Sequence, residues 1–227
     1  MDWPVLASLP AEDRSSLIAT LRRRTYRREE VIFHQGDPAD TLHLIAAGHV
    51  SVRVTLPGGE FVTVALSGPG EAFGELALVG GPRPRGATVI ALDPCETLSL
   101  SRDQFEHLLE SYPGVNRFLL ELLARRIERL NVYWLEALYV PADRRVLRRL
   151  LDLCQLYGGD GQHGDGQHIV IPVTQEMLAS LAGTTRPTAN QVLGRLAASQ
   201  LVEVGRGQIV VLNRRELHQR AGHPGQA

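Results

Sequence analysis

The chain has 227 residues, of which 44% are hydrophobic and 22% charged, and its formal net charge is −1. No apolar run reaches the roughly 18 residues of a membrane span and the N-terminus carries no secretory signal, so we expect a cytoplasmic protein with no membrane partner. Its two cysteines, Cys95 and Cys154, lack CxxC spacing, which argues against a disulfide framework, a zinc finger or an iron–sulfur cluster.

Charge is distributed unevenly along the chain. Residues 1–140 carry 14 basic and 18 acidic side chains, whereas residues 141–227 carry 10 and 7. All 24 basic side chains are arginine. The sequence pattern also changes at Pro141, and we therefore expect one domain over residues 1–140 and a second, net positive domain over residues 141–227.

The first domain begins with a helical pattern and continues with strands. Residues 10–24 are expected to form a short helix with Leu17, Ile18 and Leu21 on its apolar face. Over residues 30–100, short apolar segments alternate with glycine, proline and aspartate, which is typical of strands joined by turns. Several strands at this spacing predict a small antiparallel barrel or sandwich.

A long helix is predicted after Pro113, which separates it from a shorter one. Its apolar residues are spaced 3, 4, 3, 4 and 3 apart, which is the a/d pattern of a coiled coil. Such a seam needs a partner helix, so we expect a homodimer. A second apolar edge, Leu119, Leu122 and Leu135, leaves open the alternative that the helix packs only on its own barrel. The seam residues are Leu120, Leu123, Ile127, Leu130, Trp134 and Ala137.

The second domain begins with a further helix and then a polar loop rich in glycine and histidine. His163, Asp165 and His168 in this region have the residue types of metal ligands, but nothing around them predicts rigid positions at metal distances. We therefore expect a solvated loop without metal. The sequence also shows no nucleophile with a base at recognisable spacing, so no catalytic residues are predicted.

Two short helices joined by a tight turn are predicted next. Thr174 is a good N-cap for the first helix, and Gly183 permits the turn. Thr185 is expected to cap the second helix, with Pro187 tolerated in its first turn. The strand-like segments that follow predict the wing of a winged helix-turn-helix. Candidate DNA-binding residues are the caps Thr174 and Thr185 and the exposed face Arg186, Thr188, Asn190, Gln191 and Arg195.

The order of these parts resembles the cyclic-AMP receptor protein/FNR superfamily of bacterial transcription regulators over roughly residues 5–213. "FGELAL" followed by "RPRGATV" resembles the phosphate-binding cassette of the family, "GDPADTLHLIAAGHVSV" its early β-roll signature, and "ARRIERLNVYWLEAL" its dimerisation helix. The resemblance implies an α+β fold with an N-terminal antiparallel β-roll, a long dimerisation helix and a C-terminal winged helix-turn-helix. It further implies a homodimer that binds a near-palindromic site in double-stranded DNA and contacts RNA polymerase.

The resemblance also implies a ligand site. In cyclic-nucleotide-binding members, backbone amides and an arginine of the cassette hold the cyclic phosphate, while a glutamate accepts the ribose hydroxyl. By motif position, Gly74 and Glu75 take the ribose-side roles and Arg85 the phosphate role, and Arg83 has none; this is an anion nest with a charge-assisted clamp. The implied effector is cyclic AMP or another cyclic nucleotide. Candidate ligand-binding residues are Gly74, Glu75, Leu76, Arg85, Gly86, Ala87, Leu130 and Asn131.

Three features depart from the family pattern. The cassette usually has serine or threonine after the arginine, where this chain has Gly86. Cyclic-AMP binders commonly show threonine and then serine or asparagine on the dimerisation helix, where this chain has Leu130 and Asn131. One missing hydrogen bond to a charged ligand costs about 1.5–3 kcal/mol, roughly ten- to a hundredfold in affinity. In the recognition helix, Arg186 is followed by Pro187 instead of the usual cytosine-reading glutamate, so a different base preference is expected.

Other readings stay open beside a cyclic-nucleotide effector. Glu75 and Arg85 could pair with each other in a vestigial pocket, leaving a regulator that is active without ligand. FNR-like oxygen sensing needs an N-terminal cysteine cluster, which the sequence lacks, and haem sensing would need an axial ligand such as His34, His43 or His49. A phosphodiester-cleaving enzyme is a remote alternative, because it would leave the helix-turn-helix unexplained.

Overall fold

The computed structural model describes residues 6, 10–80, 83–112, 114–158 and 168–221. Its internal contacts define two compact units, Met1–Leu130 and Asn131–Ala227. Compact units need not coincide with domains, so the expected boundary at residue 140 stays a prediction. The expectations for Pro113, His163 and Asp165 fall outside the described residues.

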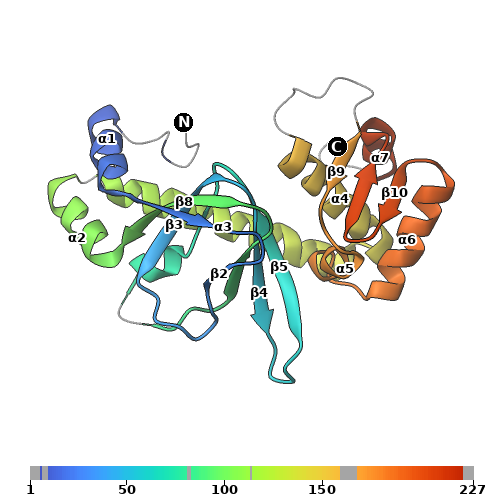
Figure 1. Ribbon diagram of the computed structural model, residues 1–227, viewed down its shortest axis with the longest axis horizontal. Helices are drawn as coiled ribbons and strands as arrows, with labels where there is room; N and C mark the ends of the chain where they lie inside the picture. The colour runs from blue at the N-terminus through green and yellow to red at the C-terminus, as the bar shows by residue number, and fades with distance from the viewer. Residues whose placement is uncertain (1–5, 7–9, 81–82, 113, 159–167, 222–227) are drawn as a thin grey trace. The chain divides into compact units, whose positions relative to one another are not determined.

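Two antiparallel sheets form the β-roll of the first unit (Figure 1). The strand order is β1-β8-β3-β6 in one four-stranded sheet and β2-β7-β4-β5 in the other. Buried apolar side chains such as Ile45, Val52 and Val89 alternate along these strands and form a core. The antiparallel β-roll expected from the sequence is thus confirmed. The strands are β1 (Arg22–Tyr26), β2 (Val31–Phe33), β3 (Thr41–Ala47), β4 (Val50–Thr55), β5 (Phe61–Ser67), β6 (Ala72–Phe73), β7 (Thr88–Ala91) and β8 (Cys95–Ser101).

Three helices cover a second core of this unit. They are α1 (Ala11–Thr20), α2 (Arg102–Ser111) and the first part of α3 (Gly114–Tyr139). Leu17 of α1, Phe105 of α2 and Phe118 of α3 are fully or almost fully buried with Leu42 and Leu100 of the sheet. Burial of each such side chain contributes about 1.5–3 kcal/mol, which fixes the helices on the β-roll.

The first helix is shorter than its sequence pattern predicts. It ends at Thr20, and Arg22–Tyr26 forms strand β1, with Arg22 opposite Ser99 of β8. Ile18 is exposed, so only Leu17 and Leu21 of the three predicted apolar residues face the core. Pairing with β8 supplies a ladder of backbone hydrogen bonds, which outweighs the good helix propensity of the arginine run.

The second unit is a winged helix-turn-helix, as expected from the sequence. Its three-stranded antiparallel sheet has the order β10-β11-β9. Leu150, Leu178 and Leu193, one from each of the three contacting helices α4, α5 and α6, are fully or almost fully buried. None of the described helices is long and apolar enough to cross a bilayer. The elements are α4 (Ala142–Gly158), β9 (Ile169–Ile171), α5 (Gln175–Leu181), α6 (Arg186–Ala198), β10 (Val202–Gly205), β11 (Gln208–Val211) and α7 (Arg214–Ala221).

Candidate ligand cassette and DNA interface

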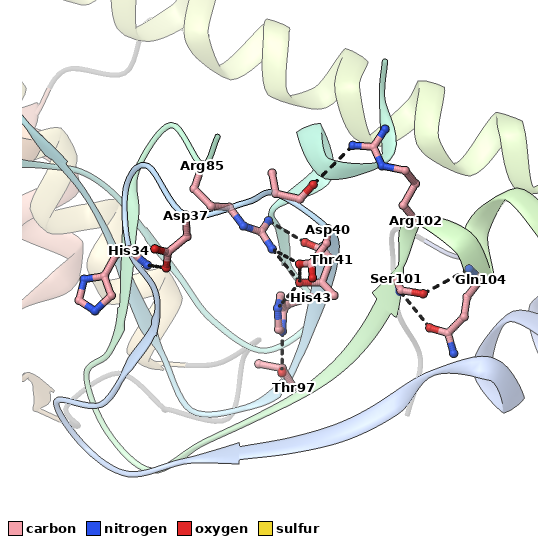
Figure 2. A network of polar contacts seen from close by, with 11 residues as sticks. His34, Asp37, Asp40, Thr41, His43, Arg85, Thr97, Ser101, Arg102 and Gln104 are labelled. Carbon is pink, nitrogen blue, oxygen red and sulfur yellow. Dashed lines mark hydrogen bonds and ion pairs between the residues drawn. The ribbon is translucent and has the colours of Figure 1, made fainter. Parts of the chain in front are cut away.

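Arg85 is the centre of the cassette (Figure 2). Its side chain is only 5% exposed, although it carries a charge. Nη1 donates to the carbonyl oxygen of Thr41 at 2.7 Å, and Nη2 donates to the Thr41 hydroxyl at 2.7 Å and to Asp40 Oδ1 at 3.3 Å. The guanidinium lies over the ring of Phe33, 4.0 Å from its centroid. Four contacts therefore hold this side chain in one orientation.

Gly74 and Glu75 lie beside this arginine. Gly74 has φ +81°, and a Cβ at this position would lie 2.8 Å from Thr41 O and 2.9 Å from Arg85 Nη1, so only glycine fits. Glu75 begins the short 3₁₀ helix η2 (Glu75–Leu78) and is buried. Burial lowers the pKa of Arg85, whereas the charges of Asp40, Asp37 and Glu75 raise it. Among the described residues, Arg85 forms its ion pair with Asp40 and not with Glu75.

Several N–H donors of residues 85–87 have no protein acceptor among the described residues. The Nε of Arg85 is buried and donates to no acceptor in the part of the chain that the structure describes. Within that part, the amides of Gly86 and Ala87 donate to no backbone carbonyl. A buried cation and several unused N–H donors fit a phosphate group. Gly86 is exposed and offers no hydroxyl, Ala87 is half-buried, and Leu76 is exposed.

The histidines considered as haem ligands have other contacts. His43 is buried, and both of its ring nitrogens lie within hydrogen-bonding distance of threonine hydroxyls. Nδ1 of His49 lies 2.7 Å from Asp93. Both ring nitrogens of His43 therefore have partners, and His34 is an exposed residue.

The predicted dimer seam lies along α3 and is largely exposed. Leu120 is 66% exposed, Ile127 58% and Trp134 69%. Leu123 differs, because it is half-buried and packs on the β-roll core. Leu130 and Asn131, assigned to the ligand by resemblance, are also exposed, and the contact units divide between them. A row of exposed apolar side chains on one face of a long helix points to a partner.

Helix α6 presents the predicted DNA-binding residues. Thr185 caps it by accepting a hydrogen bond from the Thr188 amide at 3.4 Å, and Thr174 caps α5 by accepting from the Met177 amide at 3.1 Å. Ala189, Val192, Leu193 and Leu196 are buried and fix the helix on its core. The opposite face is therefore free, with Arg186, Asn190, Gln191 and Arg195 exposed and Thr188 half-buried.

Arg145 joins α4 to the turn between α5 and α6 and to the residue after α3, and the sequence did not predict these contacts. From α4 it donates through Nε to Ala182 O at 2.8 Å and through Nη2 to Gly183 O at 2.9 Å, both in the turn between α5 and α6. Its Nη1 donates to Val140 O at 2.7 Å, just after α3. One arginine within a basic helix gives no sequence signal for such a role, because its acceptors are backbone carbonyls.

A buried ion-pair cluster, also missed, fixes the last turns of α3. Glu136 of α3 pairs with Arg148 at 2.9 Å and with Arg149, both on α4. The guanidinium of Arg149 lies 4.2 Å from the ring centroid of Tyr133. The carboxylate is buried in a stretch of α3 whose neighbouring residues are mostly exposed, and the only sequence signal was an acid among apolar residues.

Comparison with known proteins now identifies the family. A cyclic nucleotide-binding domain model matches residues 23–112, and a Crp-like helix-turn-helix domain model matches residues 144–220. The chain is 33% identical over 208 residues to the cyclic AMP receptor protein of Thermus thermophilus, covering 92% of each chain. The chain belongs to the CRP/FNR superfamily. It is a DNA-binding transcription regulator with a cyclic nucleotide-binding domain, as the resemblance in its sequence implied.

Other similar members of the CRP/FNR superfamily carry different functional names. A global nitrogen regulator of Synechocystis is 30% identical over 190 residues, covering 83% of this chain and 84% of that one. The solved structure of the c-di-GMP responsive global regulator CLP from Xanthomonas campestris is 25% identical with a TM-score of 0.72, covering 90% of this chain and 100% of that one. Superfamily membership therefore does not identify the effector of this chain, and the residues of the cassette must indicate it.

Proposed function

We propose that this CRP/FNR regulator is a cytoplasmic homodimer that binds a near-palindromic DNA site under the control of a cyclic nucleotide held in the β-roll. The observation that carries the ligand is the buried guanidinium of Arg85, whose Nε lacks a partner in the described structure and which lies near the unused amides of Gly86 and Ala87. The protein acts by binding, and we expect no turnover of the nucleotide.

Each cassette residue has a proposed role. Arg85 and the two amides hold the cyclic phosphate, and Glu75 accepts the ribose hydroxyl. The carboxylate of Asp40 is 76% exposed, so its pair with Arg85 is weak and yields to a phosphate. Gly74 allows close approach of the backbone, while Leu76 and, on α3, Leu130 and Asn131 contact the remainder of the nucleotide.

The DNA interface follows from the exposed face of α6. Arg186 reads guanine by a bidentate contact, Asn190 and Gln191 read neighbouring bases, and Arg195 contacts phosphate. Thr174, Thr185 and Thr188 surround this face and contact the DNA backbone. Arg206, exposed in the β10–β11 turn, adds a phosphate contact from the wing. In a dimer with paired α3 seams, two such helices reach half-sites roughly 34 Å apart, next to bound RNA polymerase.

The test combines calorimetry with selection of DNA sites. Purified protein is titrated with cyclic AMP, cyclic GMP and cyclic di-GMP, and DNA sites are selected from random oligonucleotides with and without each nucleotide. We expect one nucleotide to bind and to strengthen selection of a site with dyad symmetry. Equal DNA selection without any nucleotide binding would instead support the vestigial pocket. A selected site without dyad symmetry would contradict the proposed dimer.

A further inference from the structure

His43 lies at the centre of a chain of polar contacts behind the cassette (Figure 2). It is on β3 and 5% exposed. Its Nε2 lies 3.3 Å from the Thr41 hydroxyl, and its Nδ1 lies 3.1 Å from the Thr97 hydroxyl on β8. The same Thr41 hydroxyl accepts the 2.7 Å hydrogen bond from Arg85 Nη2. One hydroxyl group therefore joins the imidazole to the proposed phosphate clamp.

The ring of His43 also contacts Phe73, the residue before Gly74. It stacks on Phe73 with centroids 5.0 Å apart and an interplanar angle of 3°. The two residues are paired in the β3–β6 register, and Phe73 directly precedes Gly74 and Glu75. Phe33, which lies under the guanidinium of Arg85, has its ring centroid 6.1 Å from that of His43. His43 thus contacts Phe73, which precedes Gly74, and is connected to Arg85 through Thr41 and Phe33.

Every hydrogen bond around His43 and Thr41 can be given a donor and an acceptor without conflict. Burial, followed by the charges of Arg85 and Arg24, lowers the pKa of His43 to about 3 against the opposing effect of Asp40, so the ring is neutral and has one N–H. If Nε2 carries it, it donates to Thr41, whose own hydrogen bonds Asp40 Oδ1 at 3.1 Å, while Thr97 donates to Nδ1. In this tautomer Thr41 accepts two hydrogen bonds and donates one.

We propose that His43 is a positioning residue of the ligand cassette, which orients Arg85 through the Thr41 hydroxyl and holds the segment carrying Gly74 and Glu75 through Phe73. The proposal rests on the proposed function, because the oriented groups are those assigned to the nucleotide. It goes beyond that function, since His43 itself touches no ligand.

The first test compares cyclic AMP affinities of full-length variants. His43→Phe keeps an aromatic ring for Phe73 and removes both hydrogen bonds, and we expect a loss of about tenfold. Thr97→Val removes the hydroxyl that contacts Nδ1 of His43 and also bonds Tyr26, away from Arg85, and should cause a smaller loss in the same direction. His107→Phe, at an exposed position on α2, is the matched control and should bind as the wild type. Wild-type affinity in His43→Phe would overturn the proposal.

A double-mutant cycle separates positioning from packing. Thr41→Val removes the hydroxyl that connects His43 to Arg85. If His43 acts through that hydroxyl, adding His43→Phe to Thr41→Val should cause little further loss of affinity. Two losses that multiply, each as large as in the single variants, would show independent effects and overturn the proposal.

A third measurement does not depend on the nucleotide. The buried Nε–H of Arg85 should give a signal in ¹⁵N NMR spectra that exchanges slowly with water and is absent in Arg85→Ala. In His43→Phe we expect this exchange to accelerate at least tenfold. If wild type binds none of the cyclic nucleotides, the proposed function fails, and this readout still decides the role of His43. An unchanged Arg85 signal in His43→Phe would then refute it.

Discussion

Two arginines of the cassette show how much the surroundings of a single residue matter. Arg83 and Arg85 are separated by one proline, but Arg83 is exposed whereas Arg85 is buried against Phe33 and bonded to Thr41. A buried guanidinium with an unused donor is a stronger anion site than one surrounded by water, because its field is less screened. Replacing Arg85 should therefore lower cyclic nucleotide affinity much more than replacing Arg83.

Replacing Arg85 by alanine should lower cyclic nucleotide affinity at least a hundredfold, because a clamp of several charge-assisted hydrogen bonds is lost. Replacing Arg83 by alanine should change it less than about twofold, as expected for an exposed charge. Calorimetry on both variants, with thermal unfolding to verify the fold, makes the comparison. Similar losses in the two variants would mean that the clamp has been assigned to the wrong arginine.

Burial of His43 should make stability depend on pH. In the unfolded chain a histidine binds its proton below about pH 6.5, but in the folded protein His43 stays neutral down to about pH 3. Its contribution is therefore complete above pH 6.5 and declines as the pH falls from 6.5 towards 3, by about 1.4 kcal/mol per unit. Urea unfolding at pH 7, 6 and 5 should show this extra decline in wild type and not in His43→Phe. If the free energy of unfolding fell equally with pH in wild type and in His43→Phe, His43 would be protonated in the folded protein as well.

At the scale of elements, the last turns of α3 belong to the second unit. Glu136 pairs with Arg148 and Arg149 across the α3–α4 connection, and Arg149 also lies over Tyr133. A buried carboxylate shared by two guanidiniums is costly to remove, because the remaining charges lose their compensation. These turns should therefore be fixed to α4 by electrostatics more than by apolar packing.

Glu136→Ala should lower the free energy of unfolding of the second unit by about 3 kcal/mol. The matched control is Glu216→Ala, which breaks the half-exposed i,i+4 pair with Arg220 at 2.6 Å. Breaking that pair should cost less than about 0.5 kcal/mol. Urea unfolding followed by circular dichroism measures both. Equal, small effects would mean that the Glu136 cluster is solvated.

Sequence patterns predicted those elements whose signals are local. The caps Thr174 and Thr185 and the period of buried residues located α5 and α6. The roles of Glu75 and Arg85 came from the resemblance to the family cassette and stay predictions. The first three residues of strand β1, Arg22–Arg24, were read as helix because their partners on β8 lie more than 70 residues away in the chain. The contacts of Arg145 could not be predicted because its acceptors are backbone carbonyls. Those of His43 could not be predicted because the sheets bring its partners together from distant parts of the chain.

At the scale of the whole molecule, we expect the exposed seam of α3 to pair with a second chain. Leu120→Asp with Ile127→Asp should give monomers, because opposed carboxylates in an apolar seam are strongly unfavourable. Leu123 is left unchanged, since it also packs on the β-roll core. Val132→Asp, exposed on the same helix but off the seam, should stay dimeric. Light scattering distinguishes the forms, and a double variant that remains dimeric would refute the seam.

DNA-binding measurements on the full-length protein test the roles proposed for the arginines of α6. Arg186→Ala should cost about 1–3 kcal/mol and relax preference at one base pair in each half-site, as expected for a lost bidentate contact with guanine. Arg195→Ala should weaken specific and random DNA alike and flatten the salt dependence. Selection from randomised oligonucleotides and binding at several salt concentrations measure both effects. An unchanged base preference in Arg186→Ala would mean that another residue reads the guanine.

The contacts of Arg145 bear on how such a regulator diversifies. Its three acceptors are the main-chain carbonyls of Val140, Ala182 and Gly183, which exist whatever side chains stand there. The exposed face of α6, which we propose reads the bases, takes no part in these contacts. On this proposal, substitution at Arg186, Asn190 or Gln191 should change operator preference while the hydrogen bonds of Arg145 are retained. The same separation makes this scaffold suitable for grafting new recognition helices.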